Sequence, residues 1–277
     1  IYYPRLLDSA ERMRIATYLS LKFGISLVHD SYYAGSLGET IWNPREFASY
    51  NFDVSGIGRD SGSVLKIQQA KNTKDQVLET WIGERKKINI LNNYPSIDGF
   101  YFLYGHNNNG LVFSDDSSSG VKILKRKWKI ENTKHLGDQI KVNYLFRGKN
   151  LFQHLPENGD KIWLIVGKSE DIMGSPFERF EGRKLNNNEL QIDSVAFNWT
   201  NTDILFFTLM TGPDLLVLTE RQRDCGKAFG DYNVHIEGGT SPYRIEFHRK
   251  DGRVFEYLSE NKIRQIEGIP DGEYTFR

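Results

Sequence analysis

The sequence predicts a mainly β protein: a β-sandwich domain with one N-terminal helix, followed by a small immunoglobulin-like β-module. After Ile25 the chain consists of short segments rich in β-branched and aromatic residues, separated by clusters of Gly, Asn, Asp and Ser. A stretch near the N-terminus carries the spacing and caps of a helix. With 277 residues, 39% of them apolar, the chain is long enough for two domains with buried cores.

The helix is predicted over residues 9–23. Asp8 is its N-cap, and Glu11 stands at the reciprocal position of a capping box. Gly24 supplies the left-handed residue that ends it. An apolar stripe at helical spacing is expected to face the core, formed by Ile15, Tyr18, Leu19 and Phe23.

Strand-like segments follow the helix, and their spacing predicts a sandwich. They lie at residues 40–42, 63–70, 76–83, 99–106, 121–131, 139–146, 161–167, 189–197 and 204–212. In "QIKVNYLF" the alternation puts Ile140, Val142, Tyr144 and Phe146 on one face. The turns "HNNNG" and "LNNNE" are polar tips where Asn tolerates a positive φ.

A domain boundary is predicted near Leu218, which gives domains of residues 1–218 and 219–277. "TGPDLLVLTERQRD" holds Pro213 and a mixed-charge run, which are typical of a junction. The tail then reads as strand, Gly-Gly turn, strand, Asp251-Gly252 hairpin and strand. A turn at residues 270–272 leads into a further strand that stops at "GEYTFR", so we expect a piece of a longer polypeptide, incomplete at this end.

The stretch "DVSGIGRDSG", residues 53–62, has the look of a phosphate-binding loop. Its glycine spacing does not fit G-x-G-x-x-G, and no G-K-[ST] follows. Residues 64–68 predict a strand, so no helix dipole would face a phosphate. We interpret the stretch as a glycine-rich β-turn or bulge.

Composition excludes some functions. Basic and acidic residues are equal at 36 each, which argues against a nucleic-acid partner. No apolar run approaches the roughly 20 residues that cross a bilayer, so no direct membrane insertion is expected. The single cysteine, Cys225, excludes an internal disulfide, and its role stays open. The histidines lack zinc-type spacing, so a zinc site would need long-range assembly. We interpret them as isolated surface or turn residues: His29, His106, His135, His154, His235 and His248.

Candidate site residues are few. Asp115 and Asp116 in "SDDSSSG", and Asp53 and Asp60 in the glycine-rich stretch, offer the hard oxygens that calcium prefers, without the spacing of a known calcium loop. Tyr32 and Tyr33, in the loop after the helix, are candidates for stacking on a sugar. The tryptophans in strand patterns are expected in the core: Trp42, Trp81, Trp128, Trp163 and Trp199. No catalytic residue and no cofactor is predicted, with calcium left as an open alternative.

Several motifs in order resemble a known family. "SAERMRIATYLSLKFGISL", "YNFDVSGIGRDSGSVLKIQQAKN", "FYFLYGHNNNG" and "RKWKIE" are similar to an uncharacterised β-rich domain of very large surface proteins from gliding, type IX-secreting bacteria. The resemblance covers about residues 1–218. In that family the helix often follows a laminin-G or concanavalin-like sandwich, whose last strand resembles "IYYPRLL". A second acidic residue usually follows the match to Asp60, but this chain has Ser61, which weakens a metal reading of the loop.

The tail resembles the repeats of SprB-type gliding adhesins. Cys225, residues 238–243 and residues 272–275 match the repeat pattern. The tryptophan that usually follows the "PY" strand is absent, and Phe247 or His248 stands nearby, so the tail looks like a divergent repeat.

These resemblances imply an extracellular protein of the bacterial cell surface. Its expected partners are neighbouring β-modules of the same polypeptide and surface polysaccharide or glycans. The expected function is a non-catalytic structural or adhesive module, for spacing, display, adhesion or gliding motility, and not an enzyme. Two alternatives remain open. A shallow exposed aromatic platform would favour a carbohydrate-binding module of a secreted multidomain protein. A concave pocket with two perturbed carboxylates would favour a secreted hydrolase with dispersed carboxylates.

Overall fold

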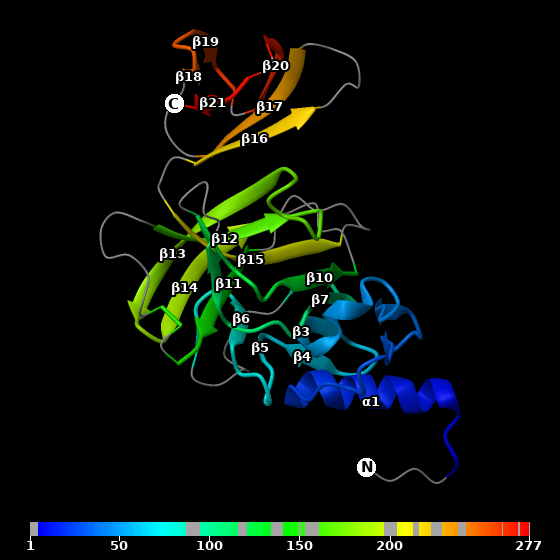
Figure 1. Cartoon of the computed structure of the whole chain (residues 1–277). Coiled ribbons are helices and arrows are strands. Elements are labelled where there is room, and N and C mark those ends of the chain that lie inside the picture. Colours follow the sequence, from blue (N-terminus) through cyan, green and yellow to red (C-terminus); the bar gives the residue numbers. More distant parts are fainter. Residues whose placement is uncertain are drawn as a thin grey trace. The chain divides into compact units, whose positions relative to one another are not determined.

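The computed structural model describes residues 5–86, 95–115, 121–133, 141–149, 151–152, 161–196, 204–212, 216–222, 229–237, 242–261, 263–270 and 272–276. It confirms a mainly β protein with one α-helix in this part of the chain (Figure 1). The chain forms two compact units, the first ending at Thr211 and the second running from Gly212 to Arg277. The short segment Glu157–Lys161 is grouped with the second unit. The division therefore lies a few residues before the boundary that the sequence predicts near Leu218.

In its described residues, the first unit contains one α-helix, one 3-10 helix and fifteen strands. They are α1 (Ser9–Phe23), β1 (Tyr33–Ala34), β2 (Thr40–Trp42), η1 (Ala48–Tyr50), β3 (Phe52–Asp60), β4 (Leu65–Ile67), β5 (Gln69–Lys71), β6 (Leu78–Ile82), β7 (Phe100–His106), β8 (Phe113–Asp115), β9 (Lys122–Leu124), β10 (Trp128–Asn132), β11 (Lys141–Arg147), β12 (Lys161–Gly167), β13 (Phe177–Asn186), β14 (Glu189–Ala196) and β15 (Leu205–Gly212).

Helix α1 has the predicted bounds because its signals are local. The Asp8 carboxylate accepts a hydrogen bond from the Glu11 backbone N–H at 2.8 Å, and the Glu11 carboxylate accepts one from the Asp8 N–H at 3.0 Å. Gly24 ends the helix in the left-handed region, at φ +63°.

The buried face of α1 differs from the predicted apolar stripe. Phe23 is 55% exposed, whereas Thr17, Ser20 and Leu21 are buried. The Thr17 hydroxyl accepts a hydrogen bond from the backbone N–H of Ala34 at 3.0 Å, which holds β1 against the helix. Small side chains let the helix lie close to the strands beneath it. Of the predicted stripe, Tyr18 packs against the core, whereas Phe23 is largely exposed.

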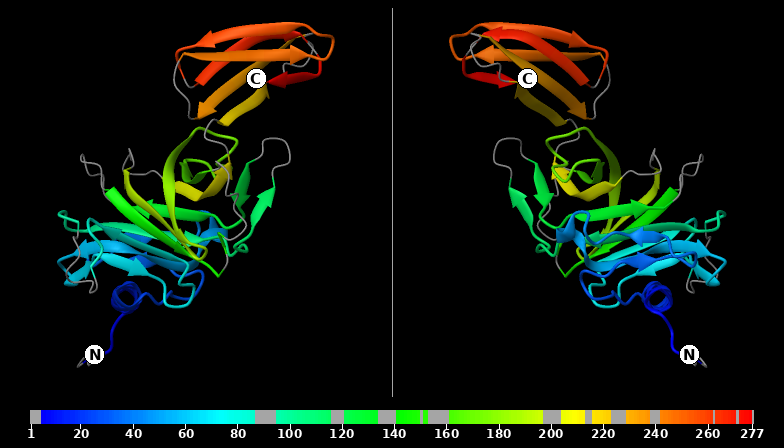
Figure 2. Two further views of the ribbon diagram at one scale, coloured as in Figure 1. Left: turned by 90° about the vertical axis from the view of Figure 1, so that its left-hand side faces the viewer. Right: turned by 90° about the vertical axis from the view of Figure 1, so that its right-hand side faces the viewer.

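Most described strands of the first unit follow one continuous hydrogen-bonded path, β4-β3-β7-β10-β15-β12-β13-β14-β11-β6-β5. Strand β13 turns the corner between the two layers, because its first part pairs with β12 and its second part with β14. The ends of the path, β4 and β5, are separated in sequence only by Gln68. The chain itself thus links both ends of the path, and the strands fold into layers (Figure 2) that enclose a hydrophobic core.

The glycine-rich stretch is mostly strand. Gly56 and Gly58 lie inside β3, where a Cβ would come within 2.1 Å of the Phe102 carbonyl oxygen and 2.7 Å of the Tyr101 ring, respectively. The two glycines therefore permit the close approach of β7. The turn interpretation holds only for residues 61–64, and a bulge lies between Phe52 and Ser55.

The described residues of the second unit form two three-stranded sheets and a core of their own. Its strands are β16 (Leu216–Gln222), β17 (Phe229–Glu237), β18 (Tyr243–Arg249), β19 (Val254–Ser259), β20 (Ile263–Pro270) and β21 (Tyr274–Phe276). Gly252, at φ +90°, lies in the predicted hairpin between β18 and β19. After β20 the chain changes sheets, because β20 pairs with β17 and β21 pairs with β18. The unit is a small immunoglobulin-like sandwich. Across the described residues, no helix has the length and apolar character to span a membrane.

Candidate functional site

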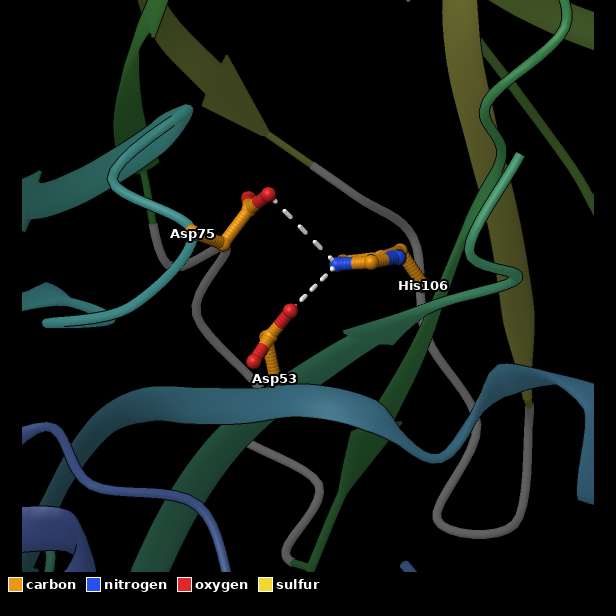
Figure 3. A group of neighbouring side chains, drawn as sticks. All are labelled: Asp53, Asp75 and His106. Atoms are coloured by element: carbon orange, nitrogen blue, oxygen red, sulfur yellow. Dashed lines mark hydrogen bonds and ion pairs between the residues drawn. The ribbon is translucent and has the colours of Figure 1, made fainter. Parts of the chain in front are cut away.

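A cluster of ionisable side chains forms where three distant segments of the first unit meet (Figure 3). Asp53 comes from the bulge of β3, Asp75 from the loop between β5 and β6, and His106 from the end of β7. One potential ligand atom of each lies within 4.8 Å of the others. This is a long-range assembly of the kind that sequence spacing does not reveal.

The bulge in β3 directs Asp53 out of the sheet. Asp53 has φ +51°, which is uncommon for a residue other than glycine. Its carboxylate oxygen Oδ2 lies 3.0 Å from Nε2 of His106. The backbone strain is thus offset by a hydrogen bond to a buried partner.

An Asn-centred turn positions Asp75. The Asn72 side-chain oxygen accepts hydrogen bonds from the backbone N–H groups of Lys74 and Asp75, at 2.8 and 3.1 Å. The backbone N–H of Thr73 donates to the carbonyl of Gly24 at 2.8 Å, which ties the turn to the end of α1. Sequence reasoning missed Asp75; the signal that could have found it is the Asn-x-x-Asp spacing of an Asx-turn.

Both ring nitrogens of His106 are engaged inside the protein. The side chain is buried, and Nδ1 accepts a hydrogen bond from the backbone N–H of Asn108 at 2.9 Å. A neutral imidazole whose Nδ1 accepts must carry its proton on Nε2. His106 therefore donates from Nε2 to Asp53, and this fixes the tautomer.

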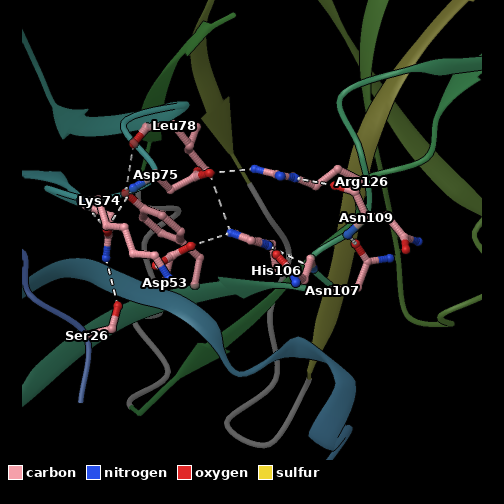
Figure 4. Close-up of polar contacts among 12 residues, drawn as sticks. Ser26, Asp53, Lys74, Asp75, Leu78, His106, Asn107, Asn109 and Arg126 are labelled. Atoms are coloured by element: carbon pink, nitrogen blue, oxygen red, sulfur yellow. Dashed lines mark hydrogen bonds and ion pairs between the residues drawn. The ribbon is translucent and has the colours of Figure 1, made fainter. Parts of the chain in front are cut away.

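Cations of the protein balance the two carboxylates (Figure 4). Nη1 of Arg126 lies 2.6 Å from Oδ1 of Asp75, and both side chains are mostly buried. Nζ of Lys74 lies 4.0 Å from Oδ1 of Asp53. The hydrogen bond from His106 lowers the pKa of Asp53 from its ordinary value, against the opposing effect of burial.

These contacts limit the chemistry of the cluster. A histidine that binds a metal normally donates its second ring N–H to an acceptor, whereas Nδ1 of His106 accepts. In this tautomer Nε2 has no lone pair to give a metal, and neither nitrogen can take a proton from a substrate while both hydrogen bonds persist. The arrangement is suited to joining β3, β7 and the β5–β6 loop.

The same cluster anchors the "HNNNG" loop. Nε of Arg126 donates to the carbonyl of Asn109 at 2.8 Å, while its Nη1 holds Asp75. The Asn107 side-chain oxygen accepts from the backbone N–H of Lys127 at 3.1 Å. Asn108 has φ +57°, as predicted for an Asn in this turn.

Beside the cluster lies an open hollow of about 560 Å³. Its lining includes Asp75, Val77, Leu111, Arg147, Lys149 and Glu189. Nη1 of Arg147 contacts the buried Glu79 at 2.5 Å, and its Nε contacts Glu189 at 3.0 Å. The hydrogen bond from Arg147 lowers the pKa of Glu189.

The structure separates the acidic residues that the sequence proposed as metal ligands. Asp53 and Asp60 stand at opposite ends of β3, about 20 Å apart at the rise of a strand, so they cannot share one ion. Asp60 is buried and accepts hydrogen bonds from Tyr101 and Ser36, at 2.6 Å from each hydroxyl. The side chain of Asp115 and all of Asp116 lie outside the described residues.

The two tyrosines after the helix do not form an exposed platform. Tyr33 is 2% exposed, and its hydroxyl accepts a hydrogen bond from the Leu27 backbone N–H at 3.0 Å. This corrects the expectation that Tyr33 is exposed. Tyr32 is half-buried, with the Arg45 guanidinium 5.6 Å from its ring centre. The predicted core tryptophans that the structure describes are all buried: Trp42, Trp81, Trp128 and Trp163.

Fold and site together define a β-sandwich protein in which both ring nitrogens of His106 and one oxygen of each aspartate are held by partners from the protein. A family model described as "Domain of unknown function (DUF8202)" matches residues 11–203, which is more than half of the chain. The chain therefore belongs to this family. Comparison with curated proteins gives no match. Comparison with solved structures gives none either.

Proposed function

We propose that this chain is a non-catalytic structural and adhesive module of a large bacterial cell-surface or secreted protein. The observation that carries the proposal is the state of His106, whose two ring nitrogens are both occupied by protein partners. A general base or metal ligand needs a free nitrogen lone pair. The cluster instead holds three chain segments together, which is the role of a structural element.

The architecture supports the same proposal. Each of the two units has its own hydrophobic core, as modules of a longer polypeptide do. In the first unit the chain links the two ends of the strand path through Gln68, which limits the open sheet edge available for association with other chains. Export, surface display, gliding motility and neighbouring β-modules as partners rest on the family resemblances alone.

The proposal is tested by incubating the protein with a panel of polysaccharides and matrix glycans, with calcium and with chelator. Retention on the glycans and new chain ends in the products are measured separately. We expect no products under any condition. Turnover that Asp53→Asn or His106→Gln abolishes would overturn the proposal.

Surface localisation has its own test. Antibodies raised against the protein should label intact cells of the source organism, and external protease should remove the signal. Labelling only after cell lysis would contradict an extracellular module.

A carbohydrate-binding module is the second candidate, and the hollow beside the cluster favours it. Its walls are polar, and Val77 and Leu111 supply apolar surface. The hydrolase alternative has less support, because the general acid of a glycosidase needs a raised pKa. The pKa of Glu189 is lowered, and Asp75 is held by Arg126.

A further inference from the structure

We propose that the hollow beside the cluster is the adhesive site and that it binds a neutral oligosaccharide. This inference deepens the proposed function and rests on its adhesive part. The hollow gathers residues from the β5–β6 loop, the β7–β8 loop, the end of β11 and the β13–β14 hairpin. Its volume of about 560 Å³ lies in the range of ligand sites, roughly 300–1,000 Å³.

The lining of the hollow has apolar as well as polar parts. Val77 is 7% exposed and Leu111 is partly buried against the core of the first unit, so both are fixed apolar contacts in its wall. The C–H face of a sugar can lie on such a surface while its hydroxyl groups reach the polar walls. An aromatic platform is not needed for this kind of contact.

The polar walls offer unused donors and an unused acceptor. Arg147 uses Nη1 and Nε for Glu79 and Glu189, which leaves the two N–H groups of Nη2 without a partner among the described residues. Asp75 uses only Oδ1 for Arg126 and His106, so Oδ2 stays available. The Lys149 ammonium adds a further donor, which makes no hydrogen bond or ion pair within the described part of the chain.

The charge of the hollow favours a neutral ligand. The carboxylates of Asp75 and Glu189 would repel an anion that approached Arg147 and Lys149. The positive charges of Lys71, Arg147 and Lys149 would repel a cation. A hydroxyl group both donates and accepts, so a polyhydroxylated chain satisfies both kinds of wall without an unpaired charge.

The ion cluster preorganises the hollow. Arg126 holds Asp75 with one nitrogen and the carbonyl of Asn109 with another, at 2.6 and 2.8 Å. Leu111 follows Asn109 by two residues, so the Arg126 guanidinium positions both a polar lining residue, Asp75, and an apolar one, Leu111. A site held in this way loses little conformational entropy when it binds.

Titration calorimetry and NMR with soluble neutral oligosaccharides test the proposal. Acidic oligosaccharides and inorganic phosphate serve as the charged probes. We expect saturable binding of at least one neutral oligosaccharide, weakened about fivefold by Lys149→Ala and by Asp75→Asn, the effect of losing about one hydrogen bond each. Lys149 is exposed and has no described partner, so its substitution should leave the fold intact.

Lys125→Ala is the matched control. Lys125 is also an exposed lysine without a described side-chain partner, but it lines a different hollow of about 470 Å³. Its substitution should leave the affinity unchanged. An affinity that falls with Lys125→Ala but not with Lys149→Ala would overturn the proposal, as would binding of the charged probes alone.

The outcomes separate this inference from the proposed function. If no saccharide binds and no product forms, the oligosaccharide site is refuted and a structural module remains. If product forms, the non-catalytic function fails whichever ligand binds.

Discussion

Among the described residues of the first unit, Lys129 of β10 is a charged side chain with none of its surface exposed. Its ammonium donates to the carbonyl of Glu46 at 2.7 Å and to Glu131 at 2.6 Å, and it lies 4.0 Å from the ring centre of Trp42. Burial lowers the pKa of Lys129 and raises that of Glu131. The lysine thereby fastens the segment around η1 onto the sheet.

Lys129→Ala should lower the free energy of unfolding by about 3 kcal/mol, because it leaves Glu131 and a backbone carbonyl without their buried partner. The double variant Lys129→Met with Glu131→Gln should lose less, since it removes both charges. Urea denaturation of the three proteins checks this. Equal losses of unfolding free energy in both variants would mean that the unpaired charge of Glu131 adds nothing to the cost of removing Lys129.

The pKa of Asp53 gives a pH dependence with a definite sign. Its pKa is lower in the folded protein than the ordinary value near 3.9, because His106 donates to the ionised carboxylate. The contribution of ionised Asp53 to the free energy of unfolding is therefore complete above about pH 4. It is lost as the pH falls through the pKa that Asp53 has in the folded protein.

Asp53→Asn should therefore flatten part of the acid limb of a stability–pH curve between about pH 2 and 5. Asn also tolerates the positive φ of this position, so the substitution adds little backbone strain. Only part of the slope should disappear, because Asp60 and Glu11 also have lowered pKa values. An unchanged acid limb would contradict the role of the His106 hydrogen bond.

Residue roles were predictable only where they depend on nearby sequence. Asp53 stood out as a candidate, but its partner His106 is 53 positions away and looked like an isolated turn histidine. Asp60 is an aspartate in the same glycine-rich stretch and was an equal candidate, yet both of its carboxylate oxygens accept hydrogen bonds from Ser36 and Tyr101. The bulge in β3 places Asp53, and not Asp60, in the cluster. The residue pattern of the stretch did not predict the position of that bulge.

At the scale of elements, α1 shows how a helix end can organise a loop. Gly24 has φ +63°, and a Cβ there would lie 2.3 Å from the carbonyl oxygen of Lys71. The Gly24 carbonyl accepts hydrogen bonds from both the backbone N–H and the hydroxyl of Thr73. The helix end thus fixes the start of the turn that presents Asp75.

Gly24→Ala should destabilise the first unit by more than about 1 kcal/mol, since it combines a positive φ with a backbone clash. Gly38→Ala is the matched control, because Gly38 has φ +88° but nothing within 4 Å of its added Cβ. Thermal unfolding should show the larger loss for Gly24→Ala. Equal losses would mean that the close contact with Lys71 has no energetic consequence.

Elements with local signals were predicted well, and elements set by tertiary structure were not. Strands β2 and β12 have the predicted bounds, and α1 follows from its caps. The predicted strand at residues 63–70 is instead two strands, β4 and β5, which meet at Gln68 and belong to different layers. Strand β13, polar and mostly exposed, was missed because its pairing with β12 and β14 defines it, rather than its composition.

At the scale of the whole molecule, the fold class was predictable because alternation and turn chemistry recur along the chain. The division into units was predictable only to within a few residues. β16 contains the charged run that looked like a junction, yet it pairs with β17 along its whole length. Charges are compatible with such a strand when one of its faces meets solvent.

Separate cores predict separate unfolding. Phe247 is fully buried in the second core, together with Val234 and Ile266. Phe247→Ala should lower the stability of the second unit by about 3–5 kcal/mol and leave the first unit unchanged. Calorimetry should then show one shifted transition and one unshifted transition. A single transition that shifts as a whole would contradict independent units.

The central proposal is that the Asp53–Asp75–His106 cluster holds three chain segments together and is neither a catalytic nor a metal centre. Long-range ¹H–¹⁵N NMR of the His106 ring, recorded near neutral pH with and without added calcium or zinc, tests it most directly. We expect the Nε2–H tautomer, with ring nitrogen shifts that neither metal changes. An Nδ1–H tautomer would leave the Nε2 lone pair free for a proton or a metal, and a ring nitrogen shift that follows added metal would show binding; either result would contradict the proposal.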